Sequence, residues 1–547
     1  MKKITLTGAS ILALALAAPA VAQNNQSTVD QSGSGQSATV TQSGEDAEAT
    51  VIQSNANNTA TITQEANSGG TVDVTQSGVE NSATVGQTSL NSDADVVQSG
   101  DRNSAELTQG RAASSSSQTN GQQALLVQSG DDNDILASQS GSSGDLNVNQ
   151  SGNNNDATIS QSGFDNSSGD NANPALVGVD QSGNDNDAFV IQSGQLSDAF
   201  VSQSGDFNIA TVNQSIGNAP NPPGGSDPRV ATATINQTGD DNISTINQTG
   251  GSDTISARLM TATSTQNGEG NDSTISQTNS ALAATAASNT ATVTQNGDDN
   301  GSTVSQDGVL LGATVVQNGD SGTSTVNQSG TGSDAFVTQS GTDQFASTTQ
   351  SGTDNLSQTI QSGNGNEATV AQSGSFGGSN VVQGNSGNIA FVDQIGTGGF
   401  SQVFQGDNPA SSGSNNFADV TQTGLNISFV GQGTGSGNST TVIQTNTGGP
   451  ANNSSVSQGD FAPGNNNTAA DIVQTGTGNT SNVNQTDLLG LGGFNSASLE
   501  QDGDDNLSNI TQNGADNSAT VSQTNDANQS FINQTGIGNA ATVTQGM

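Results

Sequence analysis

The chain has 547 residues, of which 29% are hydrophobic and 3% aromatic, and it contains no Cys, His, Trp or Tyr. Globular domains draw nearly half of their residues from the apolar set, so a conventional hydrophobic core and a multidomain enzyme are excluded. Six Lys and Arg against 49 Asp and Glu leave a formal net charge of −43, which argues against nucleic acid or an anionic membrane surface as the partner.

Residues 1–22 have the pattern of a secretory signal peptide. Lys2-Lys3 precede an apolar run from Ile11 to Ala18, and Ala20-Val21-Ala22 supplies small residues for cleavage. The run is too short to span a membrane, and the alternative of an N-terminal anchor helix lacks a basic flank after it. We therefore expect an exported protein that is not inserted in the membrane.

Residues 23–547 form a repeat that is marked by glutamine. A polar chain with high net charge is typically disordered, but a disordered chain has no reason to keep a fixed period. Eleven residues separate successive glutamines in the longest unbroken series, which is Gln295, Gln306, Gln317, Gln328, Gln339, Gln350, Gln361, Gln372, Gln383, Gln394 and Gln405. The period predicts a stack of short structural units.

The repeat from Gln150 to Gln161 shows the pattern within one unit. Asn155, Ala157, Ile159 and Gln161 alternate with acidic and hydroxyl residues, which predicts a strand of five or six residues with one small, apolar and carboxamide face. A Ser-Gly-x-x-Asn segment between strands is typical of a tight turn. Two such strands per coil give an all-β solenoid with about 22 residues per coil, and three strands per coil fit the same pattern.

Hydrophobic burial does not stabilise such a coil on its own. Two Val or Ile side chains contribute about 1.5–3 kcal/mol each, whereas ordering one backbone residue costs about 1–2 kcal/mol. Carboxamides stacked in register can donate to one neighbouring coil and accept from the other. We therefore expect the inward Gln and Asn side chains to form ladders along the stack.

The repeat resembles that of the curlins, the subunits of the curli amyloid fibres that bacteria secrete into biofilm matrix. The curlin pattern Gln-x-Gly-x-x-Asn-x-Ala-x-x-x-Gln is matched in full by Gln76-Gly78-Asn81-Ala83-Gln87, and forms with Ser in place of Ala extend the likeness from residue 31 to residue 545. The amide residues of the complete copies are the predicted self-assembly ladder: Gln76, Asn81, Gln87, Gln98, Asn103, Gln109, Gln150, Asn155, Gln161, Gln181, Asn186, Gln192, Gln203, Asn208, Gln214, Gln361, Asn366, Gln372, Gln512, Asn517, Gln523, Gln534, Asn539 and Gln545.

A Pro/Gly-rich segment at residues 218–228 interrupts the period. Its prolines cannot join a central strand ladder, so we expect it to loop out of one coil. A linker between two solenoids is the alternative.

The chain offers no recognisable catalytic or cofactor site. Without His or Cys, the Ser/His and Cys/His nucleophile systems and His-based metal centres are absent. Asp-Asp-Asn turns such as Gly130-Asp131-Asp132-Asn133 have the oxygen ligands that calcium prefers, but they lack the spacing of calcium β-rolls, which favours solvated turns. We predict a protein that is not an enzyme, with no metal and no cofactor.

The resemblance implies a secreted structural protein that assembles into curli-like fibres at the bacterial cell surface, where they support adhesion and biofilm matrix. It also implies partners: further copies of the chain, other curlin-type subunits or a nucleator, and an outer-membrane export channel. The alternative is a monomeric β-solenoid that acts as a surface adhesin or an ice-binding rod. The last strand of the pattern ends at Gln545 without a visible cap, which favours the fibre.

Overall fold

The computed structural model describes residues 24–65, 69–110, 121–142, 144–164, 167–168, 178–195, 197–216, 231–250, 258–279, 287–406, 413–433, 435–459, 468–486 and 493–546. The predicted signal peptide and the insertion at 218–228 lie outside the described residues. The chain divides into two units, residues 1–289 and 290–547, and each is described by itself.

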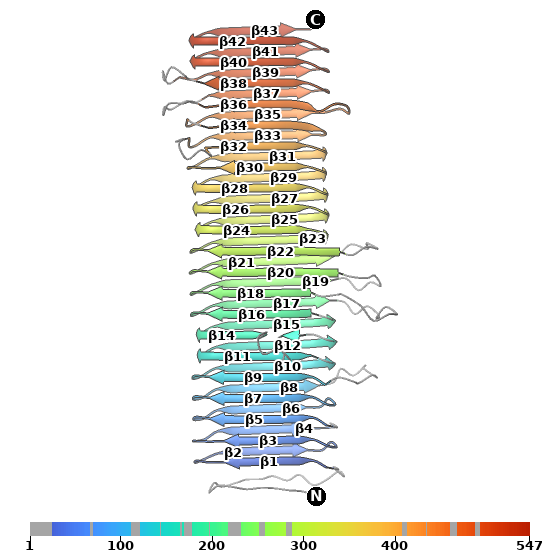
Figure 1. Cartoon of the computed structure of the whole chain (residues 1–547), viewed down its shortest axis with the longest axis vertical. Coiled ribbons are helices and arrows are strands. Elements are labelled where there is room, and N and C mark those ends of the chain that lie inside the picture. The colour runs from blue at the N-terminus through green and yellow to red at the C-terminus, as the bar shows by residue number, and fades with distance from the viewer. Residues whose placement is uncertain are drawn as a thin grey trace. The chain divides into compact units, whose positions relative to one another are not determined.

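Every regular element of the described residues is a β-strand. Except for β13 and β14, which both lie in the first sheet, successive strands alternate between two parallel sheets, here called sheet I and sheet II (Figure 1). In the first unit, sheet I contains β1 (Gln26–Gln31), β3 (Glu48–Gln53), β5 (Thr71–Ser77), β7 (Asp93–Ser99), β9 (Gln123–Ser129), β11 (Asp145–Asn153), β13 (Ser167–Ser168), β14 (Val179–Asn184), β16 (Ser197–Ser204), β18 (Ala231–Thr238) and β20 (Arg258–Asn267). Sheet II contains β2 (Ser37–Gln42), β4 (Thr59–Gln64), β6 (Ser82–Gln87), β8 (Ser104–Gly110), β10 (Asp134–Ser142), β12 (Asp156–Phe164), β15 (Asp187–Gln195), β17 (Ile209–Ile216), β19 (Ile243–Gly250) and β21 (Asp272–Asn279).

The second unit repeats this arrangement, and the same sheet names are used for it. Its sheet I contains β22 (Ala287–Asn296), β24 (Gly312–Asp320), β26 (Asp334–Thr342), β28 (Leu356–Asn364), β30 (Gly378–Gln383), β32 (Phe400–Gln405), β34 (Asn426–Gln432), β36 (Asn452–Gln458), β38 (Thr480–Thr486), β40 (Leu507–Ala515) and β42 (Gln529–Ile537). Its sheet II contains β23 (Gly301–Val309), β25 (Thr323–Thr331), β27 (Phe345–Thr353), β29 (Glu367–Ser375), β31 (Ile389–Thr397), β33 (Phe417–Thr423), β35 (Ser439–Thr445), β37 (Ala469–Thr475), β39 (Ser496–Asp502), β41 (Ser518–Thr524) and β43 (Ala540–Gln545).

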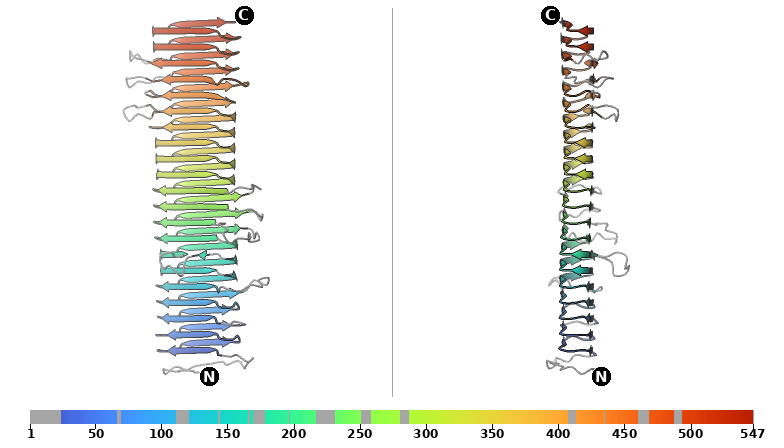
Figure 2. Two further views of the ribbon diagram at one scale, coloured as in Figure 1. Left: turned by 45° about the vertical axis from the view of Figure 1, so that its right-hand side comes forward. Right: turned by 90° about the vertical axis from the view of Figure 1, so that its left-hand side faces the viewer.

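The pairing register confirms the β-solenoid and decides the number of strands per coil. Within each unit, and outside the region of β11–β16, where the short β13 shifts the count by one, each strand pairs with the second strand after it. Gln339 thus lies opposite Gln361 and Gln350 lies opposite Gln372, 22 residues apart. Consecutive strands therefore belong to opposite sheets, apart from β13 and β14, and within each unit the two sheets form facing layers (Figure 2). One coil contains two strands, and the three-strand alternative is wrong.

The core lies between the two sheets and follows the predicted period of two. In β29 the side chains of Ala368, Val370 and Gln372 are buried, and the residues between them are half-buried. Several strands are longer than the expected five or six residues, because the backbone beyond the glutamine stays paired. Gly319 of β24, for example, lies opposite Gly341 of β26.

Strand pairing continues on both sides of the proline-rich segment. β16 pairs with β18 in sheet I, and β17 pairs with β19 in sheet II, with the strand glutamines of each pair opposite one another. The segment itself stays a prediction, because residues 217–230 are not described.

Candidate functional site: inward amide ladders and edge strands

The glutamine that ends each strand points into the core and bonds to the glutamine of the next coil. Gln339 donates through Nε2 to Oε1 of Gln361 at 2.9 Å, and Gln361 donates in the same way to Gln383 at 2.8 Å. All three side chains are almost completely buried. Donation always runs from the earlier coil to the later one, so the ladder has a direction.

The same amide also ties the two sheets together across the core. Nε2 of Gln361 in sheet I donates to the carbonyl oxygen of Phe345 at 2.8 Å and to that of Asn366 at 3.1 Å. Phe345 opens β27, and Asn366 directly precedes β29, both in sheet II. Because these bonds involve side chains that are shielded from water, losing one costs more than losing an exposed bond.

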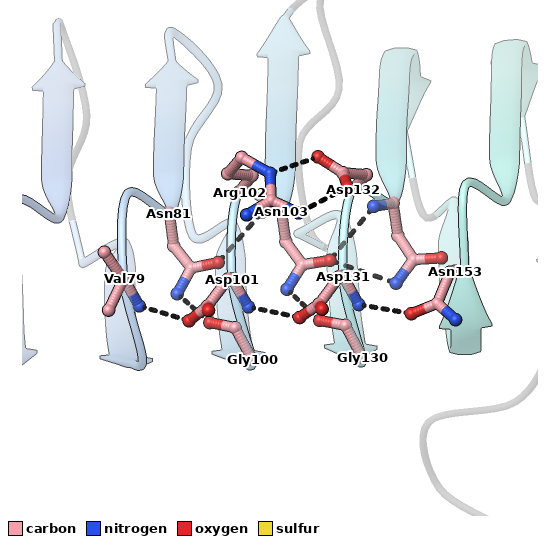
Figure 3. Close-up of polar contacts among 11 residues, drawn as sticks. Val79, Asn81, Gly100, Asp101, Arg102, Asn103, Gly130, Asp131, Asp132 and Asn153 are labelled. Atoms are coloured by element: carbon pink, nitrogen blue, oxygen red, sulfur yellow. Dashed lines mark hydrogen bonds and ion pairs between the residues drawn. The ribbon is translucent and has the colours of Figure 1, made fainter.

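The asparagine that recurs within the repeat closes the turn that leads from sheet I to sheet II. Oδ1 of Asn81 accepts the backbone N–H of Asn103 at 2.9 Å, and Nδ2 of Asn81 donates to the carbonyl oxygen of Gly100 at 2.7 Å (Figure 3). Both partners belong to the next coil. The asparagine therefore fixes the register of one turn on the next.

Acidic turn residues form a third ladder that the sequence pattern did not predict. The backbone N–H of Val79 donates to Oδ1 of Asp101, that of Asp101 to Asp131, and that of Asp131 to Oδ1 of Asn153, at 2.9–3.0 Å (Figure 3). The recurrence of Asp or Asn three residues after the strand glutamine is the signal that identifies this position. In the Asp-Asp-Asn turns, the first Asp therefore satisfies the backbone of the preceding coil.

Two positions of the turn require a left-handed backbone. Gly100 has a φ of 94°, and a Cβ atom there would lie 2.0 Å from the carbonyl oxygen of Gly130, so only glycine fits. Arg102 and Asp132 follow two residues after these glycines with φ of 57° and 58°. Asp and Asn tolerate this region better than other residues, which explains the second Asp of the Asp-Asp-Asn turns. The side chains of Arg102 and Asp132 form an exposed ion pair with an N–O distance of 2.6 Å.

The structure places the predicted ladder residues on the inner side of the coils. In the first unit it connects Gln76, Gln98, Gln150, Gln181 and Gln203 in one column of sheet I. A second column in sheet II contains Gln87, Gln109, Gln161, Gln192 and Gln214. Gln128 and Gln139 complete the columns and are absent from the predicted set, because their repeats depart from the complete motif.

The predicted asparagines occupy the turns between these columns: Asn81, Asn103, Asn155, Asn186 and Asn208. In the second unit, Gln361, Asn366 and Gln372 lie in consecutive coils with Gln383, Asn388 and Gln394. Gln512, Asn517 and Gln523 likewise join Gln534, Asn539 and Gln545. These bonds all lie within one chain, so a role of the ladder in assembly is a separate question.

The outermost described strands are paired on one side only. β1 pairs with β3 and β2 with β4, while β42 pairs with β40 and β43 with β41. The inward-facing residues of β43, Ala541, Val543 and Gln545, are half-buried, whereas the equivalent residues of inner strands are buried. These edges therefore expose core side chains and unpaired backbone groups.

The described residues contain neither a cluster of metal ligands nor a membrane-spanning helix. No three or more acidic side chains of that part of the chain come together in a way that could hold a metal ion. That part also contains no helix with the length and apolar character needed to cross a membrane.

Comparison with known proteins identifies the repeat. The family model of the curlin-associated repeat matches residues 71–96 and 152–194, which include the complete motifs beginning at Gln76 and Gln181. A search of curated proteins finds no match. The chain therefore carries curlin-associated repeats in these two segments, and this repeat is that of a structural family of fibre subunits rather than of enzymes.

Proposed function

We propose that this curlin-repeat protein is a secreted structural subunit that polymerises end to end into curli-like amyloid fibres at the bacterial cell surface. There the fibres support adhesion and biofilm matrix. The observation that carries the proposal is that the edge formed by β42 and β43 matches the edge formed by β1 and β2.

The match extends to every inward position of the two edges. If a second copy continues the stack, its Gln26–Gln31 lies on Gln529–Gln534, and its Ser37–Gln42 lies on Ala540–Gln545. Ser then faces Ser, Ile faces Val and Gln faces Gln in sheet I. In sheet II the sequence AATVTQ meets SATVTQ, with Ala, Val and Gln inward in both.

The direction of the ladder selects head-to-tail contact. Gln534 and Gln545 accept from Gln512 and Gln523, so their Nε2 groups point toward the coil that a second copy would supply. At the other edge, Gln31 donates to Gln53, and its Oε1 points away from the chain. Donors thus meet acceptors when unlike edges join. A contact of this heterologous type does not close on itself and produces a filament.

The first experiment is assembly of the purified chain, followed by electron microscopy and X-ray fibre diffraction. We expect fibres with reflections near ~4.7 and ~10 Å. A chain that stays monodisperse at high concentration would contradict the proposal and favour the monomeric adhesin.

A blocked variant tests the edge itself. The backbone N–H of Ser518 in β41 donates to the carbonyl oxygen of Asn539, just before β43. In a parallel ladder the backbone groups of alternate residues point to the same neighbouring strand, so the N–H of Ala541 points toward β41 and the N–H of Thr542 points away from it. Thr542→Pro therefore removes a donor from the open edge without breaking a bond inside the chain. Its β1–β2 edge stays intact, so the variant should add to a growing fibre and stop it at substoichiometric amounts. Thr542→Val is the control, and equal growth with both variants would contradict end-to-end assembly through β43.

The cellular parts of the proposal rest on the family likeness and on the signal-like N-terminus. Other curlin-type subunits, a nucleator and an outer-membrane export channel are the expected partners. Immunogold labelling of intact cells tests the location, and we expect label on extracellular fibres. Label confined to the cell interior would contradict it.

A further inference from the structure

The two outward faces of the second unit differ in charge. On each strand, the outward side chains before the glutamine lie one, three and five residues before it. In sheet I the only carboxylate at these positions of the described strands is Asp334. Sheet II presents Glu367, Asp393, Asp419, Asp471 and Glu500 at the same positions. A chain with a net charge of −43 therefore has one nearly uncharged face in this unit.

That face carries a cluster of apolar side chains, here called the apolar patch. It lies on β26–β34, the yellow to orange strands of Figure 1. Its apolar members are Phe336, Leu356, Ile360, Val382, Phe400, Phe404, Ile427 and Phe429, and it includes the outward amides Gln358, Asn380 and Gln402 that lie among them. Phe336, Phe400 and Phe429 are 42%, 43% and 38% exposed, although the outward surface elsewhere is mainly Thr, Ser and Asn.

The middle row of the patch is symmetric. Strand pairing places Phe336, Gln358, Asn380, Gln402 and Phe429 side by side on consecutive strands of sheet I. Three amides are thus flanked by an aromatic residue at each end, with Asn380 in the centre.

The side rows are also compact. The ring of Phe400 lies over Gly378, since its Cδ2 is 2.9 Å from the place of a Cβ atom on that glycine. On the other side, the rings of Phe404 and Phe429 have centroids 5.6 Å apart. Asp334 lies at one corner, beside Leu356. The result is a flat surface whose outward strand positions before the glutamine carry one carboxylate, Asp334, at the rim.

We propose that the apolar patch is a lateral contact between fibres, in which a second copy of the chain packs patch against patch. The proposal rests on the fibre function above. A two-fold axis parallel to the strands and centred on β30 brings the row onto itself: Phe336 faces Phe429 of the second copy, and Asn380 faces Asn380. Leu356 then faces Phe400 of the second copy.

Charge favours a second copy as the occupant. Copies of this acidic chain repel one another wherever their carboxylates meet, and the uncharged face of sheet I is where two copies approach with the least repulsion. Dry packing of apolar and amide side chains between facing sheets is the contact that amyloid sheets make. The patch supplies both kinds of side chain.

The patch is too small to hold two single chains together stably, so the lateral contact is expected only between fibres. Five strands spaced by about 4.8 Å, each with about six residues of about 3.3 Å, cover on the order of 500 Å² per copy. Stable complexes bury about 800 Å² per partner. A single pair of chains is therefore held weakly, whereas a fibre repeats the patch in every subunit and adds the contacts together.

The test compares two triple variants of the full chain. Phe400→Thr, Phe404→Thr and Phe429→Thr remove aromatic rings from sheet I. The matched control is Phe345→Thr, Phe391→Thr and Phe417→Thr, which removes outward rings from sheet II, including the pair Phe391–Phe417. Diffraction and sedimentation report fibre formation. Scanning transmission electron microscopy measures the mass per length of the fibres, which reports their lateral association.

We expect fibres in all three proteins, with mass per length halved by the sheet I variant only. Parent fibres with the mass per length of a single stack overturn the lateral contact but leave the proposed function standing, as does an equal loss in both variants. Single fibres that bind an apolar dye through the patch would show that the patch stays open in the assembled fibre, which also overturns the proposal.

A cross-linking experiment keeps the proposal testable if the sheet I variant does not fold or the parent forms no fibres. The chain contains no cysteine, so Asn380→Cys introduces a unique thiol at the centre of the patch. A short bismaleimide should join copies at high concentration about tenfold faster through this thiol than through Thr369→Cys in sheet II, because the contact raises the effective concentration. Equal rates overturn the lateral contact, and absent fibres separately overturn the proposed function.

Discussion

Replacing Gln361 by Met tests the energetic weight of the glutamine ladder. Met has a similar volume but neither the donor nor the acceptor, so the loss isolates hydrogen bonding from packing. In the parent chain, Gln361 accepts from Gln339 and donates to Gln383, and it also donates to two carbonyl oxygens of sheet II.

The partners are affected unequally. Nε2 of Gln339 keeps the carbonyl oxygen of Thr323 at 3.0 Å, whereas Oε1 of the buried Gln383 loses the donor at 2.8 Å. The carbonyl oxygen of Asn366 keeps the N–H of Phe345. We therefore count one buried acceptor left unsatisfied, which costs about 1–3 kcal/mol.

Hydrogen exchange of the backbone amides of β28 and β30 is the appropriate assay, because a repeat stack opens locally and has no single unfolding free energy. A loss of about 2 kcal/mol corresponds to about 30-fold faster exchange, since 1.36 kcal/mol is tenfold. Gln358→Met is the control: it removes the same amide from the same strand, but on the outward face. Exchange that Gln361→Met leaves unchanged, or that both variants raise equally, would refute the ladder as a source of stability.

Further predictions concern buried hydroxyls and carboxylates. Thr348 and Thr359 occupy inward valine positions, and among the described residues their buried Oγ1 atoms have no hydrogen-bond partner. Thr359→Val should therefore slow local exchange by the equivalent of about 1–2 kcal/mol, whereas outward Thr369→Val should not. Partial burial raises the pKa of Asp419, and the charge of Asp393 raises it further. The folded chain then binds more protons than the unfolded chain from the ordinary value of 3.8 up to the raised pKa, so stability falls as pH rises through this window. Asp419→Asn should raise stability at pH 7 and leave it unchanged below the ordinary value, and an effect independent of pH would contradict this cause. Fibre lag times should shorten with added sodium chloride and on acidification from neutral pH towards 5, because stacked carboxylates repel; calcium chloride at matched ionic strength should act no better than sodium chloride, and lag times indifferent to salt and pH would contradict the stacked model.

The repeat predicted the fold because the pattern of its inward residues is compatible with only one arrangement, a stack of strands with that face buried. Alternation of Ala157, Ile159 and Gln161 fixes which face is buried, and a fixed glutamine spacing makes identical residues stack. The number of strands per coil did not follow, since a strand in a coil of two or of three has the same alternation. The register of Gln339 on Gln361 decides it, and register is a long-range property.

The turns were predicted in kind but not in detail. The Ser-Gly-x-x-Asn pattern indicates a tight turn, yet the role of Asp101 depends on the backbone N–H of Val79 in the preceding coil. Likewise, a Ser in place of Ala, as at Ser357, looks equivalent in sequence. Its buried Oγ has no partner among the described residues, which only the packed coil reveals.

The apolar patch could not be predicted because outward residues are free of the repeat. Phe336, Phe400 and Phe429 are separated by unequal lengths of chain, and only strand pairing brings them to one face. The residue type at each inward position is nearly constant, because the side chain must fit the equivalent residues of the two adjacent coils. Inward residues can therefore specify stacking but little else. The outward positions are where one curlin-repeat chain can differ from another. In the second unit the outward carboxylates are concentrated on sheet II, whereas the apolar patch lies on the nearly uncharged face of sheet I. This distribution is expected if the inside of the coil directs growth along the fibre and the outside directs contact between fibres.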